Sequence, residues 1–175
     1  MSGAAQPEFS RLVPLARLGP EPFRQEMAAT EAERAALARR FDLPAVDRLS
    51  AEVELVRLGN DMFRLRASFS AEFVQSCVIT LDPVGGAVSE EFTLLYGPPE
   101  TEAEAGETVE NEIAFEPLVG NAIDVGEAVA QQFSLALPPF PRNPDAALDS
   151  EAPAADDTGP LAAALSRLLD RRGDV

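Results

Sequence analysis

The sequence of 175 residues contains no histidine, no lysine and no tryptophan, so all fourteen basic residues are arginines. Without histidine, a Ser–His or Cys–His catalytic pair and a histidine-ligated zinc site cannot be built. Without lysine, a Walker-type phosphate loop and a Schiff base are also excluded. The sequence therefore predicts a protein that is not an enzyme, and we expect neither a cofactor nor a bound metal.

Cysteine is almost absent, since Cys77 is the single one. A lone thiol cannot form an intramolecular disulfide, which is typical of a reducing compartment. A nucleophilic cysteine needs a nearby base or positive charge, and the residues around Cys77 offer neither. We therefore expect Cys77 to be a small buried residue of a strand.

Long apolar runs are missing too. The N-terminus lacks a charged region followed by an apolar segment, and no stretch approaches the roughly eighteen apolar residues that a membrane span requires. The sequence therefore predicts a cytoplasmic protein with no membrane partner.

Basic residues are absent from the middle of the chain. Residues 1–66 hold ten arginines and ten acids, whereas residues 67–141 hold thirteen acids and no basic residue. Such a surface repels a phosphate backbone, so direct RNA binding by this half is disfavoured. It attracts basic proteins instead, although solubility alone also explains an acidic surface.

The length and patterning predict one α+β domain with tails. We expect a curved antiparallel sheet or partly open β-barrel with two helices. The expected segments are a flexible leader at 1–8, the domain at 9–140 with an acidic loop at 97–117, a disordered acidic linker at 141–158, and a short amphipathic helix at 159–172.

Alternating apolar and polar residues predict the strands. The clearest hairpin joins strands 49–58 and 62–73 through the turn Gly59-Asn60-Asp61. The second strand is expected to continue from Val74 to Leu81, with a turn at 82–86 and a return strand at 87–96. Weaker patterns predict strands at 9–15 and 23–28.

Two helices have predicted capping residues. Thr30 and Glu33 form a capping box at the start of a helix that ends near Phe41, before Pro44.

A second helix opens at Ile123-Asp124, with Asp124 as N-cap and Glu127 completing a capping box. Val125, Val129 and Phe133 share its apolar face.

The C-terminal segment carries a leucine stripe at helical spacing. At about a dozen residues this helix would be marginal alone in water. It either packs on the domain or docks into a partner's groove, and the long linker favours the partner. The stripe consists of Leu161, Leu165, Leu168 and Leu169.

Arginines of the predicted hairpin form the candidate contact site for RNA or a partner. Arg64 and Arg66 share one polar strand face, and Arg57 and Arg48 are expected to join them. Cross-strand ion pairs with the neighbouring glutamates Glu52 and Glu54 are the alternative use of these arginines.

Carboxylate pairs such as Glu90 with Glu91 and Glu110 with Glu112 are expected to be solvated. An acid–base or metal site needs converging carboxylates, whereas adjacent strand residues point to opposite faces.

Two segments resemble the YceD family, the large ribosomal RNA subunit accumulation proteins of bacteria and plastids. They are Gln75-Ser-Cys-Val-Ile-Thr-Leu-Asp-Pro83 and Ile123-Asp-Val-Gly-Glu-Ala-Val-Ala-Gln-Gln-Phe-Ser-Leu-Ala-Leu-Pro-Pro139. Thr80 stands where many members have a further cysteine, so this is a cysteine-poor variant and metal binding is not carried over. The motif positions are Cys77, Leu81, Pro83, Ile123, Asp124, Leu135, Leu137 and Pro138.

The resemblance implies a non-enzymatic factor that supports accumulation or processing of large-subunit (23S) ribosomal RNA in ribosome biogenesis. We expect a monomer that contacts an assembly or RNA-processing protein, such as a basic ribosomal protein. The alternatives are a carboxylate-based RNA-processing hydrolase and an adaptor unrelated to ribosomes.

Overall fold

The computed structural model describes residues 7–59, 61–99 and 113–146. Contacts divide the chain into a compact unit, Met1–Asn143, and a second unit, Pro144–Val175, of which residues 144–146 are described. The leader to residue 6, most of the linker and the predicted helix at 159–172, with Leu161, Leu165, Leu168 and Leu169, lie outside the described residues.

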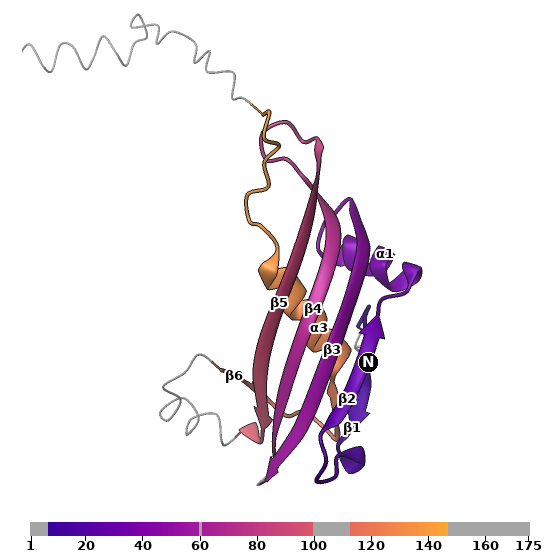
Figure 1. Cartoon of the computed structure of the whole chain (residues 1–175), viewed down its shortest axis with the longest axis vertical. Coiled ribbons are helices and arrows are strands. Elements are labelled where there is room, and N and C mark those ends of the chain that lie inside the picture. The colour runs from indigo at the N-terminus through magenta and orange to yellow at the C-terminus, as the bar shows by residue number, and fades with distance from the viewer. Residues whose placement is uncertain (1–6, 60, 100–112, 147–175) are drawn as a thin grey trace, which may run out of the picture. The chain divides into compact units, whose positions relative to one another are not determined.

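The predicted α+β class is confirmed. Two helices lie against a mostly antiparallel sheet that is not closed into a barrel (Figure 1). In the larger sheet, β2 to β5 are antiparallel neighbours, and β6 joins β5 in parallel. Its strands, in spatial order, are β2 (Phe23–Ala28), β3 (Ala45–Gly59), β4 (Met62–Ser76), β5 (Pro83–Gly97) and β6 (Ala114–Pro117).

The predicted hairpin is confirmed as β3 and β4, and both strands are longer than expected. The prediction for the next turn is wrong, because β4 ends at Ser76 and β5 begins at Pro83. The turn therefore lies at 77–82, where the Leu81 N–H donates to the Cys77 carbonyl at 2.9 Å. Leu81 adopts a φ of 63°, which reverses the chain there.

Gly86, which we expected in a turn, lies inside β5. A Cβ atom at this position would lie 2.7 Å from the Phe73 ring on the facing strand. Glycine therefore allows the aromatic ring of β4 to pack against the backbone of β5.

Three further expectations need correction. The end of the predicted acidic loop at 97–117 is a strand, β6, which pairs with the last residues of β5. Ile123 and Asp124, predicted to begin a helix, end strand β7 (Ala122–Asp124), which pairs antiparallel with β1 (Leu12–Pro14). A short 3-10 helix, η1 (Leu15–Arg17), occupies the end of the first predicted strand.

The first helix, α1 (Glu31–Arg40), begins with the predicted capping box. The Glu33 N–H donates to Thr30 Oγ1 at 3.3 Å, and the Thr30 N–H donates to Glu33 Oε2 at 2.8 Å. Both donors would otherwise lack a partner within the helix.

The second helix, α3 (Val125–Ala136), has the predicted N-cap, Asp124, which accepts the N–H groups of Gly126 and Glu127 at 3.1 Å. Glu127 does not complete a capping box. Its carboxylate instead forms a bidentate pair with Arg40 of α1, at 2.7 and 2.8 Å. This pair fixes the end of α1 to the start of α3.

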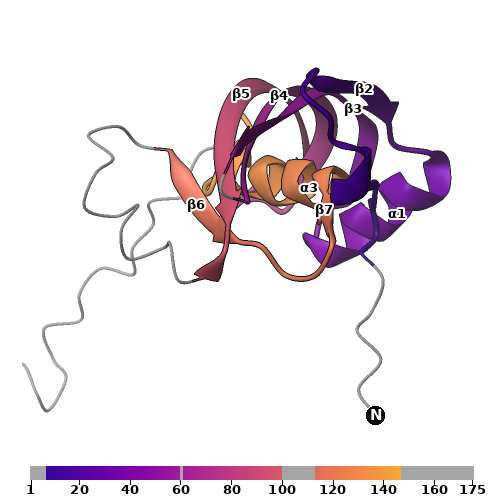
Figure 2. The ribbon, with the colours of Figure 1, turned by 90° about the horizontal axis from the view of Figure 1, so that it is seen from below.

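The core lies between α3 and the concave face of the sheet, which curves around the helix (Figure 2). Phe133 is fully buried, and its ring centroid lies 5.8 Å from that of Phe41, 6.5 Å from Phe69 and 5.6 Å from Phe73. We call the concave side the inner face. The opposite side, the outer face, is covered by neither of the two described helices.

Candidate interaction surface

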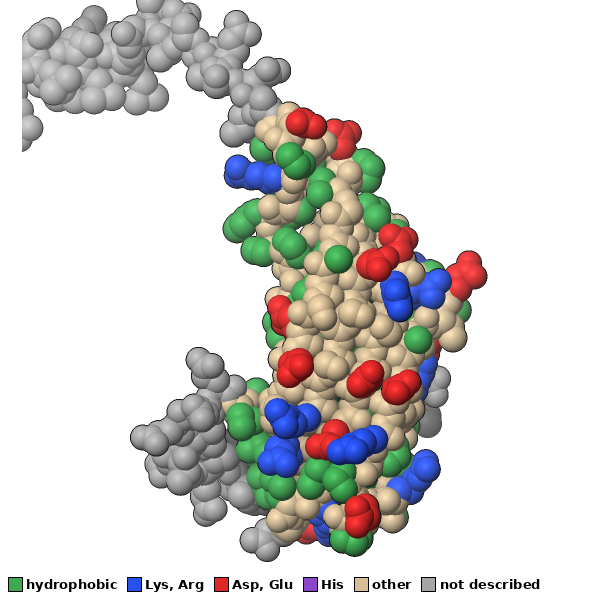
Figure 3. All heavy atoms as spheres, viewed as in Figure 1, with side chains coloured by type: hydrophobic (Ala, Val, Ile, Leu, Met, Phe, Trp, Pro, Cys, Tyr) green, Lys and Arg blue, Asp and Glu red, His purple; other side chains and the backbone are tan. Residues whose placement is uncertain are grey.

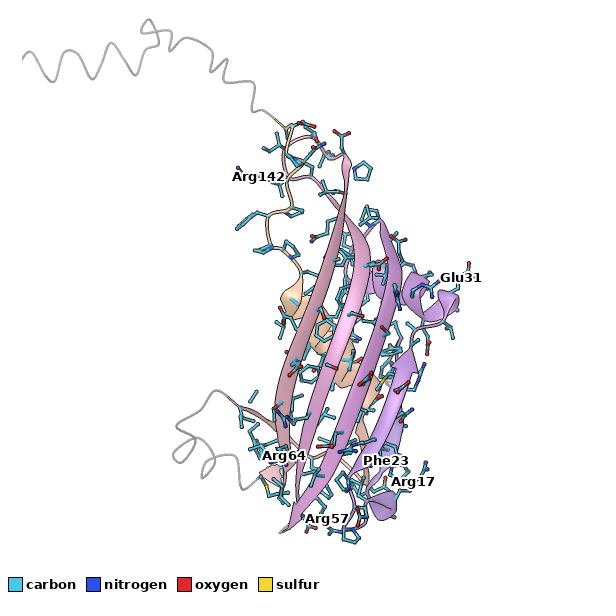
Figure 4. The ribbon with its side chains drawn as sticks, viewed as in Figure 1. Arg17, Phe23, Glu31, Arg57, Arg64 and Arg142 are labelled. Atoms are coloured by element: carbon cyan, nitrogen blue, oxygen red, sulfur yellow. The ribbon has the colours of Figure 1, made fainter. Side chains whose placement is uncertain are left out.

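The outer face carries alternate side chains of the central strands. Between Arg48 and Val56 of β3 and between Arg64 and Val74 of β4 it holds the even-numbered residues, since the odd-numbered ones in these stretches are buried in the core. The register places Arg66 opposite Glu54, and Arg64 opposite Val56. The two predicted arginines therefore lie on the same face of β4, two residues apart, and Figure 4 labels Arg64 near the lower end of the sheet. Figure 3 shows basic side chains gathered at that end.

The four predicted arginines do not form one patch. Arg57 lies opposite Phe63, which faces inward, and its guanidinium sits 5.6 Å from the centre of that ring. Arg48 lies opposite Glu72, eight positions along β4 from Arg64, which corresponds to about 26 Å at 3.3 Å per residue. The basic surface on this face is therefore built around Arg64 and Arg66.

For Arg64 and Arg66, the alternative use, cross-strand ion pairing with Glu52 or Glu54, is not found among the residues that the structure describes, whereas Arg57 pairs with Asp61 of the turn at 3.1 Å. Glu54 pairs with Arg24 of β2, at 2.7 Å, although Arg66 lies directly opposite it. Neither Arg64 nor Arg66 forms an ion pair with any residue that the structure describes. Both guanidinium groups are thus available to a carboxylate or a phosphate of another molecule.

An acidic row lies next to this arginine pair. Glu26 is opposite Glu52, and Ser68 separates Glu52 from Glu91 on β5. Like charges directly opposite each other destabilise a sheet, so this row favours a bound cationic group. An open groove of about 1120 Å³ is lined by Arg66 and by the acidic row, and it extends past β5 to Ile113 and Gln132.

Cys77 begins the turn at 77–82, which we call the Cys77 turn. Its side chain is 0% exposed, although it lies outside the main hydrophobic core. The backbone N–H groups of Asn143 and Ile79 each donate to its Sγ atom at 3.4 Å. The Asn143 donor, followed by donors of Thr80 and Ile79, lowers the pKa of the thiol to about 6.

Sequence reasoning missed this stabilisation of the thiolate. We looked for a base or a positive charge near Cys77, whereas the structure provides backbone donors. One of them is Asn143, which is 66 residues away in sequence. No local pattern predicts such a contact, because it depends on the path of the chain after α3.

The two motif segments meet beside the Cys77 turn. The Val78 N–H donates to the Pro141 carbonyl at 2.9 Å, and the Gln75 Nε2 donates to the Pro138 carbonyl at 3.0 Å. Exposed apolar side chains flank these contacts, and Figure 3 shows hydrophobic groups gathered there. We call this set the apolar end: Val78 (48% exposed), Leu81 (77%), Leu135 (76%) and Phe140 (74%).

The other motif residues lie at the start of α3 and have a structural role. Ile123 is buried, and Asp124 caps the helix. The motif therefore combines residues that hold α3 in the sheet with residues at the exposed apolar end. Leu137 is half-buried and lines a hollow with Val78 and Pro141.

The carboxylates give no sign of a reactive centre. Glu90 lies opposite Phe69 and Glu91 opposite Ser68, so the two point to different faces, while Glu110 and Glu112 lie outside the described residues. Within the described ranges, no three Cys, Asp or Glu side chains form a group that could hold a metal ion. None of the described helices is long and apolar enough to cross a membrane.

Comparison with known proteins identifies one family. The model of the large ribosomal RNA subunit accumulation protein YceD matches residues 65–162. The match begins in β4 and includes the Cys77 turn, α3 and the apolar end. The family's name implies a role in accumulation of large-subunit ribosomal RNA, and it names no reaction. Neither the curated proteins nor the solved structures include a match to this chain.

Proposed function

Because the chain belongs to the family of large ribosomal RNA subunit accumulation proteins, we propose that it acts in this process without catalysing a reaction, by contacting a protein of the assembly or processing machinery. The observation that carries the proposal is the meeting of two motif segments at the apolar end. Exposed apolar side chains clustered at one place are typical of a protein contact site.

The partner we propose is a basic protein, such as a ribosomal protein. Between residues 67 and 141, a range that includes the end of β4, β5, β6, β7 and α3, the chain has thirteen acidic and no basic side chains. An acidic surface accelerates association with a basic partner and repels the phosphates of free RNA. The effect on ribosomal RNA is therefore indirect in this proposal.

Depletion and rescue test this function. We expect the ratio of large- to small-subunit ribosomal RNA to fall in depleted cells and to recover with the full-length protein. The double variant Leu81→Ser and Phe140→Ser should fail to restore it, since both side chains lie at the apolar end. The matched control is Leu12→Ser with Leu58→Ser, which also removes two exposed leucine-sized groups (65% and 49% exposed) but lies outside the motif.

A version that lacks residues 159–172 tests the leucine stripe of the C-terminal segment. If this segment docks into the partner, the truncated protein should also fail to restore the ratio. An unchanged ratio on depletion would overturn the proposed function. Co-purified partners that include no ribosomal or assembly protein would favour an adaptor role elsewhere.

The arginine pair supports a second candidate, direct contact with ribosomal RNA. Arg64 and Arg66 are adjacent on an uncovered face and have no described ion-pair partner. Replacing both with Glu should weaken RNA retention, and the dependence of binding on salt should become shallower because two phosphate contacts are lost. Filter binding at several salt concentrations measures this, and unchanged retention would remove the candidate.

A further inference from the structure

Among the residues that the structure describes, nothing pairs with one edge of the large sheet over most of its length. β6 pairs only with Leu94–Gly97 of β5, and no other described strand pairs with this edge between Pro83 and Thr93. The segment after α3 forms hydrogen bonds with Val78, Cys77 and Gln75, in the Cys77 turn and at the end of β4. The edge is visible in Figure 1, where β5 borders the sheet above β6.

The edge lacks several of the features that normally prevent strand addition, and its charged side chains, Glu90 and Glu91, are both acidic. Natural edge strands are often short, bulged, or protected by lysine or proline. β5 has fifteen residues, no basic side chain, and a proline only at its first position. Its pairing with β4 continues without a register shift from Pro83 to Tyr96. The backbone donors and acceptors of this edge are thus arranged to pair with an extended segment.

The side chains along the edge define which segment fits. Glu90 and Glu91 are exposed at its centre, one on each face of the strand. Beside them, the half-buried side chains of Phe92 and Ile113 line the groove that extends around this edge to α3. An added strand would place alternate side chains toward Phe92 on the inner face and toward Glu91 on the outer face.

We propose that the open edge of β5 binds an extended basic segment of a partner protein as an additional strand. Backbone pairing would hold the segment, its lysines or arginines would lie on the outer face beside Glu91, and its apolar side chains would lie on the inner face beside Phe92. The inference rests on the proposed function, because it specifies how a basic partner of the assembly machinery is bound. A basic terminal extension, with alternating cationic and apolar residues, has the required chemistry.

A second copy of this chain is a poorer occupant. Each copy has a net charge of −16, and edge-to-edge pairing would bring glutamates of both copies close together. Repulsion between like charges opposes this arrangement. The charge of the edge therefore selects a cationic strand over a second β5.

The test uses the full-length protein and a labelled peptide of alternating lysine and valine. We expect binding to protect from hydrogen exchange those β5 amides of residues 84–93 that point away from β4. Replacing Glu90 and Glu91 with Lys should weaken binding by about tenfold or more. The matched control is Glu21→Lys with Glu31→Lys, which makes the same change in charge at exposed positions on either side of β2, away from β5 and from the groove.

A second control separates strand pairing from simple charge attraction. A peptide with the same side chains but N-methylated at alternate backbone positions keeps its charge and loses half of its donors. We expect it to bind at least about tenfold more weakly. A milder variant, Glu90→Gln with Glu91→Gln, provides the same comparison if the lysine variant unfolds.

Several results would overturn the inference. Equal loss of binding in the β2 control, or equal binding of the N-methylated peptide, would show non-specific attraction. Edge amides already protected in the free monomer would show that the chain itself covers the edge, and a dimer by light scattering with protected edge amides would show that a second copy does. If the Glu90 and Glu91 variant restores the ribosomal RNA ratio in depleted cells, the inference fails while the proposed function stands.

Discussion

The carboxylate of Asp124 accepts a hydrogen bond from the Ser10 hydroxyl at 2.5 Å, across 114 residues of sequence. Its other oxygen accepts the N–H of Arg11 at 2.7 Å and the first N–H groups of α3. One side chain thus caps the central helix and ties it to the N-terminal segment. Asp124, a motif position away from the apolar end, therefore has a structural role.

We predict that Asp124→Ala lowers the free energy of unfolding by about 2 to 4 kcal/mol, because it removes an N-cap and two further hydrogen bonds to a charged group. Ser10→Ala removes one of these bonds and should cost only about 1 kcal/mol. Chemical denaturation measures both values. The control is Asp47→Ala, at an exposed aspartate of β3, and an equal loss in that variant would contradict the role of Asp124.

Glu33 gives a second prediction, on stability against pH. Its hydrogen-bonded pair with Arg11, at 2.6 and 3.1 Å, lowers the pKa of the Glu33 carboxyl to about 2, with a further contribution from the Thr30 donors. A pKa lowered by folding stabilises the protein above the unfolded value of about 4.5, and this stabilisation is lost as the pH falls toward 2. Screening at the surface limits it to roughly 1 to 2 kcal/mol.

We therefore expect the difference in unfolding free energy between the native protein and Glu33→Gln to shrink between pH 5 and pH 2. Glu31→Gln serves as the control, since Glu31 is exposed in the same helical turn. A difference that stays constant over this range would contradict the assigned pair.

Gly126 gives a third prediction, in which the usual helix preference is reversed. Alanine normally stabilises a helix by about 1 kcal/mol relative to glycine. A Cβ atom at Gly126, however, would lie 2.6 Å from the Phe9 carbonyl oxygen and 2.8 Å from the Arg11 nitrogen. These are backbone atoms, so Gly126→Ala should instead destabilise the protein by about 2 kcal/mol or more.

Thermal unfolding measures the effect of Gly126→Ala. The control is Gly19→Ala, because a Cβ atom there meets nothing within 4 Å. Stability gained by the Gly126 variant would show that the N-terminal segment does not pack on α3 as described.

Local patterns predicted the elements that show a regular alternation of apolar and polar side chains or that begin with a capping box. The alternation from Val53 to Phe69 predicted the β3–β4 hairpin, and Thr30 with Glu33 predicted the start of α1. The Cys77 turn was misplaced because glycine and proline usually indicate a turn, whereas Gly86 here lies against the distant ring of Phe73. Strands β6 and β7 are short, and their pairing partners lie far away in sequence, so no local period reveals them.

The candidate surface was partly predictable from the alternation of side chains in β4. Alternation placed Arg64 and Arg66 on one face of β4, but it could not show that Glu54 pairs with Arg24 of another strand. Arg57 lies two residues after the inward-facing Leu55, so it is on the same side of β3, and this places it over Phe63. The thiolate site at Cys77 depends on the Asn143 N–H, which comes from the chain after α3. The sequence of the turn alone does not show that Asn143 lies there.

Cys77 gives the last prediction. Because hydrogen bonds from Asn143 and the turn lower the pKa of the thiol from about 9 to about 6, folding favours the thiolate. This stabilisation is fully present above the unfolded pKa of about 9 and is lost as the pH falls through about 6. The stability difference between the native protein and Cys77→Ala should therefore increase between pH 6 and pH 9. Thiolate absorbance in the ultraviolet measures the pKa directly.

Two substitutions at Asn143 test the cause of this pKa. Asn143→Pro removes the backbone N–H that donates to Sγ, so the pKa of Cys77 should rise toward its ordinary value. Asn143→Ala keeps the N–H and should leave the pKa low. Equal pKa values in the two variants would show that the donor is not the N–H of residue 143. The thiolate would then depend on the Thr80 and Ile79 donors within the turn.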